Sequence, residues 1–170
     1  MNDSVRALTR SALSASVGVV LLYLGSVVPG GKLAFLCLST LGVVFIRLCC
    51  PWQWSLGCYA VTAACAAFLL PTKALAVFYA VFFGYYPLLK MLTERISSLG
   101  VRLLLRLGLF NAVFFGLWFL ARALFSQAIG SAMAPVWLLW IAANIGFLIY
   151  DYALGQMILY YLRNIAGRIK

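Results

Sequence analysis

Residues 136–162 read VWLLWIAANIGFLIYDYALGQMILYYL, and this stretch decides the fold class. Its only charged residue is Asp151, and most of the other positions are apolar or aromatic. A helix needs roughly 20 consecutive apolar residues to cross the hydrocarbon core of a bilayer, which is about 30 Å thick. The stretch therefore predicts a transmembrane helix.

The rest of the chain has the same character. Of its 170 residues, 66% are hydrophobic and 9% are charged, and the mean hydropathy is +1.06. A soluble domain carries roughly a quarter charged residues. We therefore expect an all-α bundle of six transmembrane helices, forming a single domain over residues 1–170 within the lipid bilayer. The predicted spans are residues 7–28, 33–48, 54–70, 74–92, 103–125 and 136–162.

The basic residues give an independent test of this division. If the amino terminus is cytoplasmic, ten of the 13 Lys and Arg residues fall on the cytoplasmic side, and only Lys32, Lys73 and Arg122 fall outside. Cytoplasmic loops of membrane proteins carry such an excess of Lys and Arg. The pattern predicts six spans with both termini in the cytoplasm, because losing or merging one span would scramble it.

The net charge of +10 would point to nucleic acid in a soluble protein. Here the basic residues lie at the ends of apolar segments, where they act as topology signals and contact anionic lipid head groups. We therefore expect no nucleic-acid partner.

Residues that many enzymes and metal sites need are missing. The chain has no histidine, and its five cysteines lack a paired C-x-x-C arrangement, which argues against a zinc site. It also has no Walker A motif and no serine nucleophile elbow. The sequence predicts a protein that is not an enzyme and that holds no cofactor and no metal.

Asp151 is the sharpest functional signal, because an unpaired carboxylate inside a bilayer costs about 2.5–3.5 kcal/mol on insertion scales. It should face the bundle interior beside a partner, together with the neighbouring Tyr150. Asn144 lies two helical turns earlier on the same face. The candidate partners are Lys90 of the fourth span and, in the fifth, Arg106 and Asn111. Of the two on the fifth span, Asn111 should lie closer to the depth of Asp151.

Two interpretations of this polar group remain open. In one, it is an ion pair or hydrogen-bonded network that only holds spans four to six together. In the other, it lines a polar pocket for a solute.

The fourth span is interrupted by Gly84-Tyr85-Tyr86-Pro87, which should lie at membrane depth. Proline removes a backbone donor and frees a carbonyl near residue 83. A broken helix inside a membrane often borders a cavity, so Tyr85 and Tyr86 are candidate solute contacts. A simple packing kink is the alternative.

Ala7, Ser11 and Ala15 repeat at every fourth position of the first span. Small residues at this spacing let helix backbones approach closely in lipid. The stripe predicts either packing inside the bundle or the docking of a partner subunit.

Three motifs carry a resemblance to a known group of proteins. They are residues 83–90 (FGYYPLLK), residues 109–111 (LFN), and the segment from Asn144 to Asp151. They resemble those of uncharacterised six-span membrane proteins of the clostridial kind. The overall plan is similar to the substrate-binding S components of energy-coupling-factor (ECF) vitamin transporters, which are small, basic, six-helix proteins with cytoplasmic ends.

The resemblance implies a subunit of a bacterial cell-membrane importer that captures a small solute. Ala7, Ser11 and Ala15 would then match the face that contacts a transmembrane coupling subunit, which works with ATPases. Asp151, Asn144, Asn111 and Lys90 would form or brace the solute pocket. The alternative function is that of a structural or accessory membrane protein, whose polar network only fixes helix packing.

Overall fold

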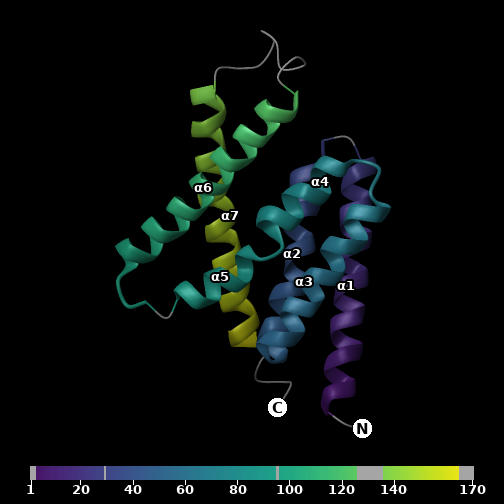
Figure 1. The fold of residues 1–170 in the computed structure, drawn as a ribbon. Helices are drawn as coiled ribbons and strands as arrows, with labels where there is room; N and C mark the ends of the chain where they lie inside the picture. Colours follow the sequence, from purple (N-terminus) through teal and green to yellow (C-terminus); the bar gives the residue numbers. More distant parts are fainter. Residues whose placement is uncertain (1–2, 29, 95, 126–135, 165–170) are drawn as a thin grey trace. The chain divides into compact units, whose positions relative to one another are not determined.

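The computed structural model describes residues 3–28, 30–94, 96–125 and 136–164 (Figure 1). In these ranges all regular structure is helical. The chain forms two compact units, residues 1–95 and residues 96–170, and each is described by itself below.

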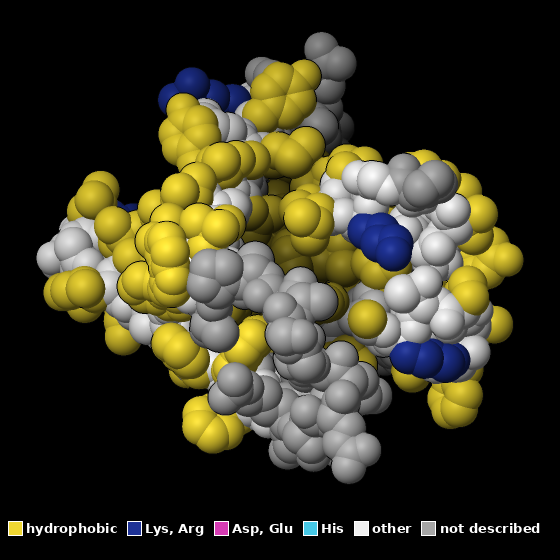
Figure 2. All heavy atoms as spheres, turned by 90° about the horizontal axis from the view of Figure 1, so that it is seen from above, with side chains coloured by type: hydrophobic (Ala, Val, Ile, Leu, Met, Phe, Trp, Pro, Cys, Tyr) yellow, Lys and Arg dark blue, Asp and Glu magenta, His cyan; other side chains and the backbone are white. Residues whose placement is uncertain are grey.

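Five helical segments of the described chain are long and apolar enough to cross a bilayer. Their ranges are Ser4–Val27, Lys32–Cys49, Lys73–Thr93, Leu99–Phe119 and Trp137–Arg163. Large hydrophobic side chains lie exposed on them, among them Leu104 and Phe119, which are 72% and 75% exposed. Hydrophobic side chains are also spread widely over the face drawn in Figure 2, where Lys and Arg form isolated spots. These features are those of a multi-pass membrane protein, since lipid is the solvent that favours such a surface.

Unit 1 opens with three helices, α1 (Asp3–Val27), α2 (Lys32–Cys49) and α3 (Trp52–Leu69). Helix α2 ends where Cys50 turns extended, and α3 begins directly after Pro51, whose fixed φ suits a helix start. Helices α2 and α3 each have 18 residues. Helix α3 is not among the five apolar segments, because it begins with the weakly hydrophobic and polar residues 52–55 (WQWS).

Helices α1 and α2 pack with their backbones close together. A Cβ atom added to Gly42 would lie 3.0 Å from the backbone oxygen of Ser14, so any larger residue here would press on the α1 backbone. One cluster of buried side chains joins α1, α2 and α3 here; it comprises Ala7, Ala15, Val43, Ile46, Cys50 and Cys58, together with Leu88. A second cluster comprises Leu22, Leu36, Ala66, Leu70, Leu75, Ala76 and Tyr79.

The fourth predicted span is a helical segment in three pieces. Helix α4 (Lys73–Phe78) passes into the π-helical turn η1 (Tyr79–Phe83), and α5 (Tyr86–Thr93) follows after a turn at Gly84 and Tyr85. The backbone N–H of Gly84 donates to the carbonyl of Tyr79 at 2.7 Å, which closes the wide turn. Pro87 lies in the first turn of α5, where its missing N–H leaves no helical hydrogen bond unmade.

Unit 2 contains two long helices, α6 (Leu99–Phe125) and α7 (Val136–Asn164). They have 27 and 29 residues, so each is long enough to cross a bilayer. Their side chains meet at several points, described below.

The sequence placed the helical segments well. Every predicted boundary lies within four residues of an observed helix end. The main differences are the interruption of the fourth segment by a π-helical turn and the division of the chain into two compact units.

Candidate functional site

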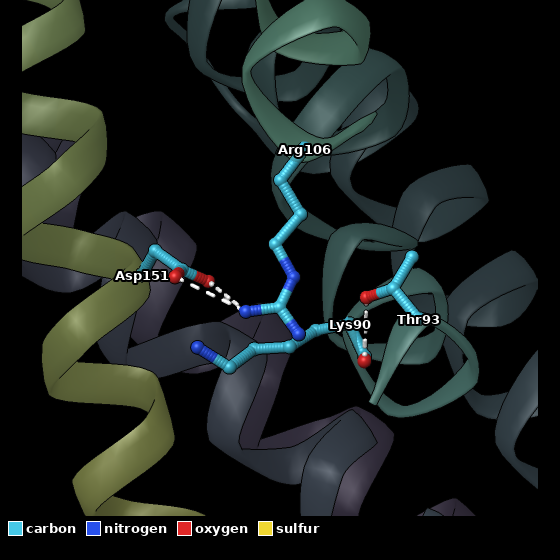
Figure 3. A network of polar contacts seen from close by, with 4 residues as sticks. All are labelled: Lys90, Thr93, Arg106 and Asp151. Atoms are coloured by element: carbon cyan, nitrogen blue, oxygen red, sulfur yellow. Dashed lines mark hydrogen bonds and ion pairs between the residues drawn. The ribbon is translucent and has the colours of Figure 1, made fainter. Parts of the chain in front are cut away.

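Asp151 of α7 forms an ion pair with Arg106 of α6. One terminal nitrogen of the Arg106 guanidinium donates to both carboxylate oxygens, at 3.3 and 3.4 Å (Figure 3). The two side chains are 11% and 13% exposed, so the charges are largely withdrawn from the surroundings. Arg106, one of the two cations predicted as partners, is therefore in contact with Asp151.

Asn111 of α6 and Asn144 of α7 face each other. The Asn111 Nδ2 donates to Asn144 Oδ1 at 3.1 Å and to the Leu107 carbonyl at 2.8 Å. The Asn144 Nδ2 donates to the Trp140 carbonyl at 2.9 Å, and the Trp140 indole donates to Asn111 Oδ1 at 2.5 Å. The expectation that Asn111 lies closer than Arg106 to the depth of Asp151 is wrong, because Arg106 pairs with Asp151 and Asn111 lies opposite Asn144.

An aromatic contact lies between these two polar contacts. The rings of Phe110 and Phe147 stack at a centroid distance of 4.5 Å with an angle of 11° between their planes. Along α6 the contacts involve residues 106, 110 and 111, and their partners on α7 are residues 151, 147 and 144. This reversed order makes an antiparallel set of contacts, which we call the α6–α7 ladder. Each of its polar side chains is satisfied by another protein group, as buried polar groups in lipid must be.

Tyr150 precedes Asp151 on α7 and is 9% exposed. It is therefore largely buried. Gly155, one turn beyond Asp151, is partly exposed.

In unit 1 the residues predicted to contact a solute lie on the interrupted fourth segment. Tyr86 is buried, and its ring stacks on Phe82 at 5.0 Å. Tyr85 is only partly buried, and its ring meets Tyr59 of α3 edge-on at 6.4 Å. Lys90 is 2% exposed, and its backbone carbonyl accepts a hydrogen bond from the Thr93 hydroxyl at 2.9 Å (Figure 3).

Tyr59 is the residue at this break that the sequence did not single out. Its hydroxyl donates to the carbonyl of Ala80 at 2.7 Å, within the π-helical turn. Its ring also fills the space beside Gly84, because a Cβ atom built there would overlap the ring carbons of Tyr59. A lone tyrosine in the small-residue segment of α3 was the available signal, but its partner carbonyl follows only from the fold.

The stripe of Ala7, Ser11 and Ala15 lies inside unit 1. The three residues are 8%, 7% and 4% exposed, and both alanines belong to the cluster with α2 and α3. The packing interpretation therefore accounts for the stripe. A partner helix cannot reach it in this arrangement unless α2 and α3 move aside.

A shallow groove runs between α3 and the α4–η1 part of unit 1. It is lined by Ala63, Ala67, Lys73, Ala76, Val77 and Ala80. Lys73 lies at its end, where the ammonium donates to the carbonyls of Ala67 and Phe68 at 2.8 and 3.4 Å and so caps α3. In the described part of the chain no three His, Cys, Asp or Glu side chains gather to form a metal site.

No protein-family model matches the chain, and neither a curated protein nor a solved structure matches it.

Proposed function

We propose that the chain is the solute-capturing subunit of an importer of the ECF type, resembling the S components of those transporters. It would lie in the bacterial cell membrane with six spans, of which α2 and α3 have 18 residues each, and with both termini in the cytoplasm. A transmembrane coupling subunit and its ATPases would supply the energy, and a small solute would be the cargo.

The observation that carries this proposal is the interruption of the fourth segment. Irregular backbone at membrane depth is tolerated where protein buries it or where it lines a cavity, and transporters use such breaks to bind substrates. Here the break involves a π-helical turn, a glycine at position 84, and the Tyr59 hydroxyl, which donates a hydrogen bond to the Ala80 carbonyl.

Two side chains at the break are suited to solute recognition. Tyr85 is partly exposed, and it offers an aromatic face and a hydroxyl. Lys90, about one turn beyond Pro87, is a buried cation inside an apolar segment. Ionisable groups at such places mark substrate or ion pathways by default. We assign solute contact to Tyr85 and Lys90, and assign to Tyr86 a supporting position against Phe82.

The α6–α7 ladder has a bracing role in this proposal. Arg106 pairs with Asp151 within unit 2, and Asn111 is hydrogen-bonded to Asn144. They would hold the two helices in one geometry, next in sequence to the buried Tyr150.

The test is mass spectrometry of small molecules released from the purified protein. The full chain is purified from its native membrane in mild detergent and denatured, and the extract is compared with that of Lys90→Gln and Tyr85→Ala variants. We expect one compound that the wild type retains at near stoichiometric amount and that both variants lose. Gln156→Ala, an exposed position on α7, is the matched control and should retain it. Absence of any enriched compound, with no ATPase pair co-purifying, would overturn the proposal.

The alternative is a structural or accessory membrane protein, and the mutual satisfaction of the ladder favours it. In that case Asp151→Asn would reduce stability without a change in any retained compound. A solute-capture role predicts that stable variants at Lys90 lose the compound while the ladder stays intact. Purification distinguishes the two further, since a complex without transport ATPases supports the alternative.

A further inference from the structure

One end of unit 1 carries a concentration of positive charge. The first turns of α1 contain Arg6 and Arg10, and the last turn of α2 contains Arg47. Trp52 and Trp54 open α3 at the same end of the helix pair. Tryptophan and arginine together are typical of the level at which lipid head groups meet the hydrocarbon core.

The packing of α1 on α2 brings Arg10 and Arg47 to the same level. The helices are antiparallel, and the crossing point pairs Ser14 with Gly42. One helical turn toward this end, Arg10 therefore lies opposite Ile46, the residue before Arg47. The pKa of the Cys50 thiol is consistent with this position of Arg10. Burial raises this pKa, the neighbouring Cys49 raises it further, and the charge of Arg10 lowers it. Arg10 thus lies within electrostatic reach of the end of α2.

Trp52 holds one of the two guanidinium groups in place. The Arg47 guanidinium carbon lies 5.5 Å from the centroid of the Trp52 ring, a cation–π distance. The Nε atom of Arg47 is buried and has no hydrogen-bond partner among the described residues. A partly desolvated cation in this state is stabilised by a nearby anion.

The described chain supplies no such anion. Neither Arg10 nor Arg47 forms an ion pair with a described carboxylate, and the whole sequence has only Asp3, Glu94 and Asp151 as acids. Arg10 and Arg47 lie at the same level of the α1–α2 pair, and a phosphate can accept charge-assisted hydrogen bonds from more than one arginine.

We propose that Arg10 and Arg47 bind the phosphate of an anionic phospholipid head group, and that Trp52 holds Arg47 at the level of that phosphate. A lipid is favoured over a soluble phosphate because the two arginines lie at the ends of helices with exposed hydrophobic sides, among them Leu13 and Val17 of α1. The acyl chains then lie along α1 while the head group meets the arginines. This site is independent of the proposed solute site.

The test uses the full chain, stripped of lipid in detergent and then mixed with phosphatidylglycerol or phosphatidylcholine for native mass spectrometry. Each arginine near a membrane surface contributes about 1 kcal/mol to anionic lipid binding, so Arg10→Gln and Arg47→Gln should each weaken phosphatidylglycerol binding roughly fivefold. The double variant should weaken it roughly 25-fold. Lys32→Gln, an exposed cation at the opposite end of α2, is the control and should leave binding unchanged.

Other outcomes overturn the proposal. Unchanged phosphatidylglycerol binding in the double variant, or an equal loss in Lys32→Gln, would mean that only diffuse charge attracts the lipid. Equal binding of phosphatidylcholine would remove the specificity for an anionic head group. Stabilisation by inorganic phosphate alone, to the same extent as by phosphatidylglycerol, would assign the site to a soluble anion. Because Arg10 is exposed on α1, Arg10→Gln should fold normally and decides the question if Arg47→Gln does not fold.

Discussion

Arg106 and Asp151 place opposite charges inside two apolar helices, and each charge makes the other tolerable. Transfer of either ion alone into a low-dielectric interior costs several kcal/mol. The pair is held at 3.3 Å with both side chains largely buried. Its contribution is therefore best measured as an interaction between the two residues, since a single substitution also leaves an unpaired charge.

We predict that Asp151→Leu and Arg106→Met each lower the free energy of unfolding by roughly 3 kcal/mol, because each leaves one buried charge without this partner. The double variant should lose less than either single variant, since it removes both charges. Unfolding of the full chain in bicelles, followed by steric trapping, measures all three. Gln156→Leu on the exposed side of α7 serves as control. Additive losses would show that the two charges do not depend on each other.

Arg10 and Cys50 allow a second measurement on single residues. Burial holds the pKa of Cys50 above its ordinary value, and the Arg10 charge opposes that rise by favouring the thiolate. Arg10→Gln should therefore raise the pKa further. In a variant whose only cysteine is Cys50, the pH midpoint of alkylation by iodoacetamide should move upward. Lys32→Gln should leave the midpoint in place, and a shift to lower pH in Arg10→Gln would contradict the assigned position of Arg10.

The residues of the α6–α7 ladder could be singled out from the sequence, because charges and amides are rare in apolar helices. Their pairing could not be assigned. Whether Asn111 meets Asp151 or Asn144 depends on how α6 is aligned with and rotated against α7, which contacts such as Phe110 on Phe147 determine. The burial of the Ala7 stripe was similarly undecided, because equal spacing serves packing and docking alike.

The interrupted fourth segment is stabilised by groups from a neighbouring helix. Its π-helical turn is joined to α3 through the Tyr59 hydroxyl and the Ala80 carbonyl, and the Tyr59 ring occupies the space beside Gly84. The sequence predicted the break from Pro87. It did not predict the π-helical turn or the role of Tyr59, since both depend on where α3 lies.

At this element we predict that Gly84→Ala destabilises the protein strongly, because the new Cβ would overlap the Tyr59 ring. Tyr59→Phe should cost about 1 kcal/mol through the lost hydrogen bond to Ala80. Thermal unfolding in detergent measures both. Gly57→Ala on α3 is the matched control, because a Cβ there meets no atom within 4 Å. Equal stability of the two alanine variants would contradict the described packing.

Across the whole molecule, the distribution of basic residues predicts six crossings, while five segments have the length and hydropathy for one. The number of crossings is six if α3 crosses the membrane and five if it does not. Helix α3 matches α2 in length, and 18 residues of helix span about 27 Å, close to the thickness of the hydrocarbon core. Its aromatic start at Trp52 and Trp54 suits an interface, so we expect α3 to cross.

This expectation is tested with a membrane-impermeant maleimide on intact cells. In a cysteine-free background, single cysteines at positions 31 and 72 should be labelled, and cysteines at positions 53 and 98 should be labelled only after the membrane is opened. Labelling at positions 53 and 72 on the same side would show that α3 does not cross. Labelling of position 53 but not position 31 on intact cells would reverse the orientation.

The antiparallel contacts in unit 2 also restrict how its two helices can slide. A displacement by one turn would place Arg106 opposite Phe147 or Gly155, neither of which can accept its charge. Asn111 would lose Asn144 in the same movement, so amides and ions would enter hydrocarbon together without partners. The few polar side chains thus exclude neighbouring alignments that the surrounding leucines and isoleucines alone would tolerate.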